Sequence, residues 1–78
     1  MDWNNRVEST PGVCGGRPHV KGIRLTVEFL LGLKEAGWSE KQILEEYPQL
    51  SEDDLRAVFA FVQALIEEEK YLPLPHVA

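Results

Sequence analysis

The sequence has a single cysteine, Cys14, so no disulfide can form within the chain. It contains no apolar run near the roughly 20 residues that a transmembrane helix needs, and no apolar signal core near its start. We therefore expect no membrane association. Because a free thiol fits a reducing compartment, we predict a cytoplasmic protein. A chain of 78 residues buries only a small core, which favours self-association, and we predict a homodimer.

Residues that support catalysis or metal binding are also scarce. His19 and His76 lie near opposite ends of the sequence, and together with Cys14 they form no zinc-binding pattern. A nucleophile needs a base within reach and a group that orients the base, and no acidic partner is suggested for Cys14 and His19. A Cys14–His19 pair is therefore the least favoured hypothesis. We predict a protein that is not an enzyme and that has no cofactor or metal.

Charge is unevenly distributed along a chain whose formal net charge is −5. Residues 26–78 have four cations against eleven acids, a balance of −7, and residues 1–25 have four cations against two acids, a balance of +2. An acidic chain of this kind argues against a general nucleic-acid coat. The basic segment leaves phosphate contacts open, through Arg6, Arg17, Lys21 and Arg24.

The first 24 residues form a segment rich in glycine and proline, with turn signals at residues 11–12 and 15–16. Short extended stretches at residues 6–8 and 19–21 predict a hairpin or a pair of bridged strands. A two-stranded hairpin is marginal alone, so it requires a helix of the same chain or a strand of a partner chain. The spacing of the glycines does not match a phosphate-binding loop, which favours a role in turns.

Three helices are predicted after this arm. Thr26 is the expected N-cap of a helix over residues 26–36, and Gly37 its stop. Ser39 begins a second helix with a capping box, and Pro48 ends it. Ser51 begins a third helix that frays around residues 67–70 and whose apolar residues follow helical spacing: Leu55, Val58, Phe59, Val62, Leu65 and Ile66.

The fold class expected from this order is mainly α, with a short N-terminal β-hairpin or strand arm before a three-helix helix-turn-helix. We assign a single domain over residues 1–78, made of the arm (1–24), the helices (25–70) and an apolar tail (71–78).

The second and third predicted helices form a helix-turn-helix pattern, with the helix over 26–36 as the third member. In such modules the first residues of the second helix of the motif, here the third predicted helix, contact base edges. Here those residues are Glu52, Asp53, Asp54 and Arg56, and the three acids repel the phosphates of duplex DNA. Either the basic arm approaches DNA, or the fold is present without DNA binding. The sequence leaves both open.

A second apolar stripe, made of Ala57, Phe61 and Ala64, lies beside the main apolar face of the third helix. It suggests either a contact with another chain or a wider core beneath the arm. The residues predicted to form a partner surface are Phe61, Leu65, Leu72 and Leu74.

The sequence resembles domain-of-unknown-function family 433 over about residues 6–62. Gly16–Val27 is similar to that family's signature Gly-Lys-Pro-x-Ile-x-Gly-Thr-Arg-Ile-x-Val, with Ile23 in place of the usual threonine. Two later blocks also match, Ala36–Ser39 with Ile43, Leu44 and Tyr47-Pro48, and Leu50–Leu55 with Ala57 and Ala60-Phe61.

This resemblance implies a homeodomain-like or winged-helix-like helix-turn-helix fold. It also implies a VapB-type antitoxin of a type II toxin–antitoxin pair, which binds and neutralises a PIN-like ribonuclease toxin and represses its own operon. Two alternatives stay open. One is a DNA-binding regulator that acts without a toxin, and the other is a structural interaction domain.

Overall fold

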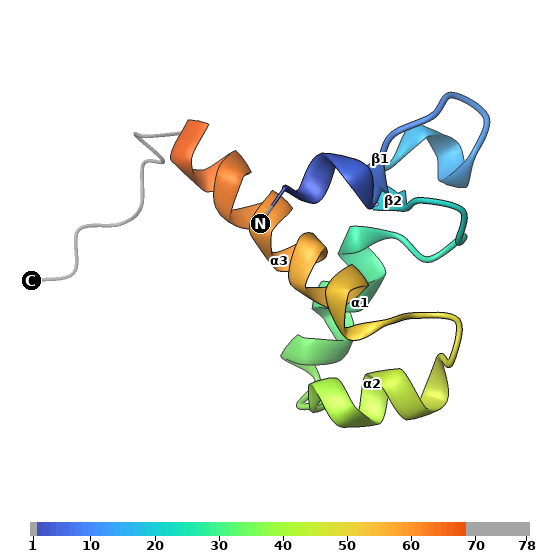
Figure 1. The fold of residues 1–78 in the computed structure, drawn as a ribbon, viewed down its shortest axis with the longest axis vertical. Helices are drawn as coiled ribbons and strands as arrows, with labels where there is room; N and C mark the ends of the chain where they lie inside the picture. Colours follow the sequence, from blue (N-terminus) through green and yellow to red (C-terminus); the bar gives the residue numbers. More distant parts are fainter. Residues whose placement is uncertain (1, 69–78) are drawn as a thin grey trace, which may run out of the picture.

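The computed structural model describes residues 2–68, which form three α-helices preceded by an arm of two short strands (Figure 1). This confirms the predicted class, mainly α with an N-terminal strand arm. The predicted tail, with Leu72 and Leu74, lies outside the described residues. The elements in chain order are the 3₁₀ turn η1 (Trp3–Asn5), strand β1 (Val7–Glu8), the 3₁₀ turn η2 (Cys14–Gly16), strand β2 (His19–Val20), and helices α1 (Val27–Glu35), α2 (Glu40–Glu46) and α3 (Glu52–Glu68).

The arm is an antiparallel pair in which Val7 faces Val20 and Glu8 faces His19. In this structure both strands belong to the same chain. The chain then reverses at Gly22, whose φ of 77° is a left-handed conformation that glycine adopts at low cost. After this turn, the N–H of Val27 donates to the carbonyl oxygen of Pro18 at 2.9 Å. The arm is thereby joined to the first residue of α1.

The helix boundaries follow the capping signals of the sequence. The Thr26 hydroxyl accepts the N–H of Phe29 at 3.0 Å, and Ser39 and Gln42 make both hydrogen bonds of the predicted capping box. Gly37 follows α1 with a φ of 97°, and its N–H donates to the carbonyl oxygen of Lys34 at 3.0 Å. Local sequence is therefore sufficient to define where α1 and α2 begin and where α1 ends.

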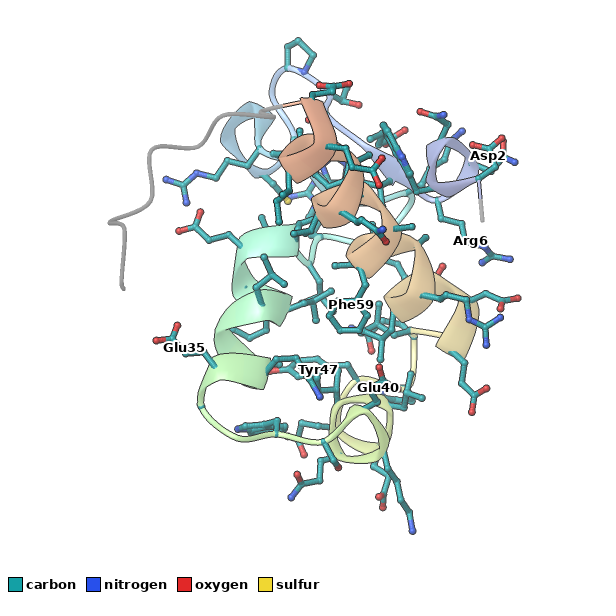
Figure 2. The ribbon with its side chains drawn as sticks, turned by 90° about the vertical axis from the view of Figure 1, so that its left-hand side faces the viewer. Asp2, Arg6, Glu35, Glu40, Tyr47 and Phe59 are labelled. Atoms are coloured by element: carbon teal, nitrogen blue, oxygen red, sulfur yellow. The ribbon has the colours of Figure 1, made fainter. Side chains whose placement is uncertain are left out.

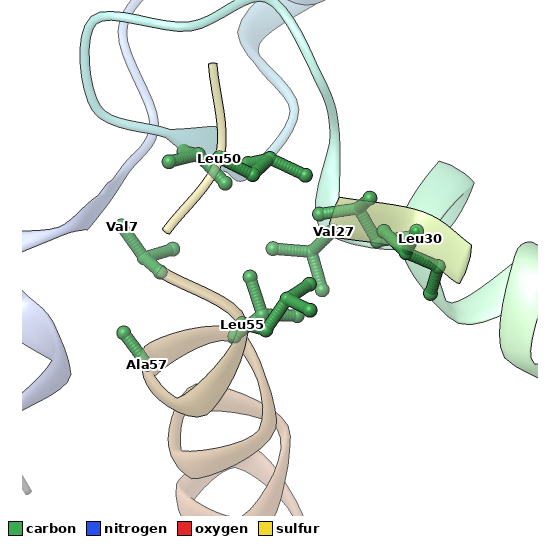
Figure 3. Close-up of a cluster of buried hydrophobic side chains, with 9 residues drawn as sticks. Val7, Val27, Leu30, Leu50, Leu55 and Ala57 are labelled. Atoms are coloured by element: carbon green, nitrogen blue, oxygen red, sulfur yellow. The ribbon is translucent and has the colours of Figure 1, made fainter. Parts of the chain in front are cut away.

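The core lies where the arm, α1 and the first half of α3 meet, with α2 closing it from below in the orientation of Figure 1. Figure 3 shows part of this cluster, with Val7 of the arm beside Ala57 of α3. The buried apolar residues come from all of these elements: Val7, Val20, Val27, Leu30, Ile43, Leu50, Leu55, Ala57 and Val58.

The apolar face of α3 is only partly buried, which corrects the prediction of an uninterrupted core face. Leu55 and Val58 are buried, but Leu65 is 44% exposed and Ile66 is 55% exposed. The far end of α3 extends past α1 in Figure 1, and among residues 2–68 no element covers it. Helical spacing identifies which residues share a face but not how far the neighbouring elements extend along it.

The second apolar stripe of α3 lies partly beneath the arm, as one of the two interpretations expected. Ala57 is completely buried. The ring of Phe61 makes an edge-on contact with the ring of Trp3, with centroids 4.8 Å apart. Phe61 is half-buried as a result, which leaves part of its ring accessible.

The start of α3 connects the arm to the helices. Ser51 and Asp54 form a capping box, in which the Ser51 N–H donates to Asp54 Oδ2 at 3.0 Å. The other carboxylate oxygen, Oδ1, accepts from Arg6 Nη1 at 3.0 Å, and Asp53 lies 3.7 Å from Arg6 Nη2. The Asp54 side chain is only 13% exposed, whereas that of Asp53 is 51% exposed. The better shielded acid therefore has two structural partners.

We expect Asp54→Ala to lower the free energy of unfolding by about 1–2 kcal/mol, because it removes a cap and a shielded ion pair. Asp53→Ala is the matched control, since it removes a charge from the same helical turn. It should cost less than about 0.5 kcal/mol. Urea unfolding of both variants tests this difference. Equal losses would show that the Asp54 contacts contribute nothing beyond the charge at the helix N-terminus.

Candidate functional site

The four arm cations that were predicted to contact phosphate fall into two groups. Arg6 is bound to Asp54 and Asp53 at the start of α3, and Arg17 Nη1 lies 3.4 Å from Glu28 Oε2 on α1. Two of the predicted phosphate contacts are thus already paired with acids of the same chain. The Arg17–Glu28 pair is exposed on both sides, so water screens it strongly.

Lys21 and Arg24 form the second group, at the turn around Gly22. Both are exposed, and the structure of residues 2–68 gives neither an ion pair. The Lys21 N–H donates to the carbonyl oxygen of Arg6 at 2.7 Å, so Lys21 and Arg6 are neighbours on the paired strands. The basic surface that the arm offers to a phosphate is therefore small, two cations on one tight turn.

His19 lies on strand β2 of the arm, where its side chain is buried. Both of its ring nitrogens face an oxygen atom of the same chain. Nδ1 lies 3.0 Å from the carbonyl oxygen of Arg17, and Nε2 lies 3.2 Å from Glu8 Oε2. Both ring nitrogens are therefore engaged by groups of the same chain, one by the backbone and one by the Glu8 side chain.

The same contacts oppose the Cys14–His19 hypothesis. A histidine that activates a thiol needs a ring nitrogen directed at it, and both ring nitrogens of His19 already face other groups. Cys14 is half-buried with a φ of 51°, at the start of η2. Within the described part of the chain, no group of three histidine, cysteine or carboxylate side chains is placed to bind a metal ion.

Two surface grooves flank α3. The first, of about 640 Å³, lies between α2 and the first half of α3, and Figure 2 shows Phe59 and Glu40 on its two sides. The charged side chains that line this groove include both acids and bases. Its lining residues are Glu40, Lys41, Leu44, Glu45, Glu52, Leu55, Arg56 and Phe59.

The second groove, of about 540 Å³, lies between α1 and the second half of α3, and we call it the α1/α3 groove. It brings together Phe61 and Leu65 of the predicted partner surface. The lining is apolar apart from two acids, and it consists of Pro18, Val27, Glu28, Leu31, Gly32, Glu35, Phe61, Val62 and Leu65.

Sequence reasoning missed the α1 side of this groove. Val27, Leu31 and Glu35 follow a spacing of four residues, as do Glu28 and Gly32, and this spacing places each set on one helical face. A Cβ placed on Gly32 meets no atom within 4 Å in the described structure.

Comparison with known proteins places the chain in a family. A family model described as "Protein of unknown function (DUF433)" matches residues 7–62. The chain belongs to the DUF433 family. The matched residues include both strands, α1, α2 and α3 as far as Val62, so the DUF433 region comprises the arm and the helices together.

Two other proteins are similar in sequence to this chain, one of them a solved structure. The crystal structure of a DUF433 member protein from Anabaena variabilis superimposes with a TM-score of 0.76 at 32% identity, covering 83% of this chain and 64% of that chain. The uncharacterized protein y4eO of Sinorhizobium fredii is 33% identical over 58 residues, which is 74% of this chain. This chain spans only 26% of the length of y4eO.

No helix among residues 2–68 combines the length and the apolarity needed to cross a membrane.

Proposed function

We propose that this chain is a protein-binding module rather than an enzyme, and that it acts as the antitoxin of a PIN-like ribonuclease. The observation that most supports this function is the acidic start of α3. In a helix-turn-helix this is the segment that contacts base edges. Here it contains Glu52, Asp53 and Asp54, and the two arginines beside them are already paired, Arg6 with both aspartates and Arg56 with Asp53.

Binding to DNA through α3 would therefore be unfavourable for two reasons. The phosphates, with one charge per about 1.7 Å of duplex, would approach three acids. Arg6 would also have to leave Asp54 to contact a phosphate, and the removal of one partner leaves a shielded carboxylate without its hydrogen bond. The same acids favour a basic partner, because complementary charge accelerates association and fixes the register of the complex.

A ribonuclease is a partner of suitable charge. An enzyme that binds RNA presents cations to the phosphate backbone, and an acidic protein can occupy that surface. The net charge of −5 for this chain, with a balance of −7 over residues 26–78, supports this complementarity. Family membership supports the fold, and the function is our proposal.

The test is co-expression of this chain with a PIN-like ribonuclease encoded beside its gene. We expect the two proteins to purify as one complex and the ribonuclease activity to fall at least tenfold. A variant in which Glu52 and Asp53 are both replaced by lysine should weaken the complex, whereas replacement of Lys34 and Lys41 by glutamate should not. A ribonuclease that stays fully active in the presence of excess wild-type protein would contradict the proposal.

A second candidate function is DNA binding through the turn that contains Lys21 and Arg24, because these cations are exposed and are not paired with acids in the described structure. It predicts binding to duplex DNA that weakens steeply with salt. The double variant Lys21→Ala/Arg24→Ala should lower the slope of log affinity against log salt by about 1.8, the share of two phosphate contacts. An unchanged slope, or no binding at low salt, would exclude this candidate.

The predicted homodimer stays a prediction that the mass in solution tests.

A further inference from the structure

The α1/α3 groove is an apolar surface that the described part of the chain leaves open. Leu65 is 44% exposed, and Leu31, Phe61 and Val62 are half-buried along its length. Apolar side chains of this size are more stable when removed from water, so a surface of this kind gains from being covered.

Gly32 gives the groove a second unusual feature. A glycine inside a helix is less favourable than alanine, yet a Cβ here would meet no atom of the described structure within 4 Å. Packing among residues 2–68 therefore does not require glycine at this position. A residue without a side chain does allow another backbone to approach closely from outside. The groove thus has a bare segment of helix backbone between its apolar walls.

The edges of the groove are acidic. Glu28 and Glu35 both lie on α1 and both line the groove, and both are exposed. Glu28 already pairs with Arg17 at 3.4 Å, but this pair is exposed, so exchange for a cation of a partner costs little. A segment that lies in the groove therefore meets carboxylates along the α1 side.

These acids oppose a second copy of the chain as the occupant. In a two-fold dimer the same patch contributes from both sides, so one interface would contain Glu28 and Glu35 of both copies, four acids in all. Like charges at an interface are destabilising, whereas lysine or arginine on a different partner would be attracted. The charge pattern therefore favours a basic protein segment.

We propose that the α1/α3 groove binds one amphipathic helix of a protein partner, with apolar residues at helical spacing and lysine or arginine along one edge. The apolar residues pack against Leu31, Val62 and Leu65, as in other helix-in-groove complexes. The backbone of the bound helix passes closest at Gly32, and its cations pair with Glu28 and Glu35. This proposal rests on the proposed function in one respect only, which is that the chain binds a protein partner.

The first test uses two synthetic helical peptides and ¹⁵N-labelled protein. Both peptides have leucines at positions i, i+3, i+4 and i+7, and they differ only in having lysine or glutamate at the flanking positions. We expect the lysine peptide to bind at least tenfold more tightly, and to shift amide resonances of α1 and of the second half of α3. Equal affinity of the two peptides, no binding, or shifts confined to the groove between α2 and α3 would overturn the proposal.

The second test fills the groove without disturbing the fold. Gly32→Leu places a side chain in open space on a helix and replaces glycine by a better helix former, so the variant should melt no lower than the wild type. It should weaken the lysine peptide at least tenfold. Gln63→Leu is the matched control, because it adds a leucine to an exposed position of α3 outside the groove, and its affinity should stay within twofold. Equal losses in both variants would overturn the proposal.

The same variants separate this inference from the proposed function. If the ribonuclease binds the wild type and Gly32→Leu equally well, the antitoxin function stands and the groove is not its interface. If the lysine peptide binds as expected but the ribonuclease stays active, the groove stands and the antitoxin function fails. A wild-type dimer in solution that Gly32→Leu converts to monomer would overturn the inference in favour of a second copy.

Discussion

The carboxylate of Asp54 is the contact on which the arrangement of the arm and helices depends. One oxygen accepts the N–H of Ser51 and completes the N-terminal cap of α3, and the other accepts from the Arg6 guanidinium. Arg6 and Asp54 are 48 positions apart, so this contact joins the arm directly to the start of α3. With Arg6 fixed there, Val7 packs beside Ala57 in the core (Figure 3).

Placed in this way, the arm packs against the helices as part of the folded domain. It buries Val7 and Val20, encloses His19 with Glu8, and brings Trp3 onto Phe61. It ends before Leu65, which stays exposed beside α1. The interaction at the start of α3 therefore pairs Arg6 with Asp54 and Asp53, and the α1/α3 groove stays open farther along the helix.

Features that depend on neighbouring residues were predictable from the sequence. The caps at Thr26 and Ser39, the end of α1 at Gly37 and the mainly α fold class all follow from interactions within a few residues. Contacts between distant residues were not predictable. The charge of Arg6 suggested a phosphate contact, and no local signal indicates that Asp54 binds it. The spacing of Leu65 places it on the apolar face of α3, but the spacing does not show that this part of the face is exposed.

The candidate site was only half visible for the same reason. Phe61 and Leu65 could be chosen from the pattern of α3, whereas the opposing wall comes from α1, which begins 25 residues before α3. Two faces that meet across a groove give no joint periodicity in the sequence. The acidic edges at Glu28 and Glu35 were likewise part of an overall negative balance, and their position beside an apolar surface emerges only from the packing.

Native-state hydrogen exchange tests most directly whether the arm is part of the folded unit. The Lys21 amide donates to Arg6 and the Val20 amide to Leu25, so both report on the arm. If the arm and helices open together, these amides should exchange with a free energy within about 1 kcal/mol of that of Val58 in the middle of α3. Arm amides that exchange with a much lower free energy than Val58 would show a loosely attached arm that is free to reach DNA. That result would contradict the claim that the arm is part of the folded unit.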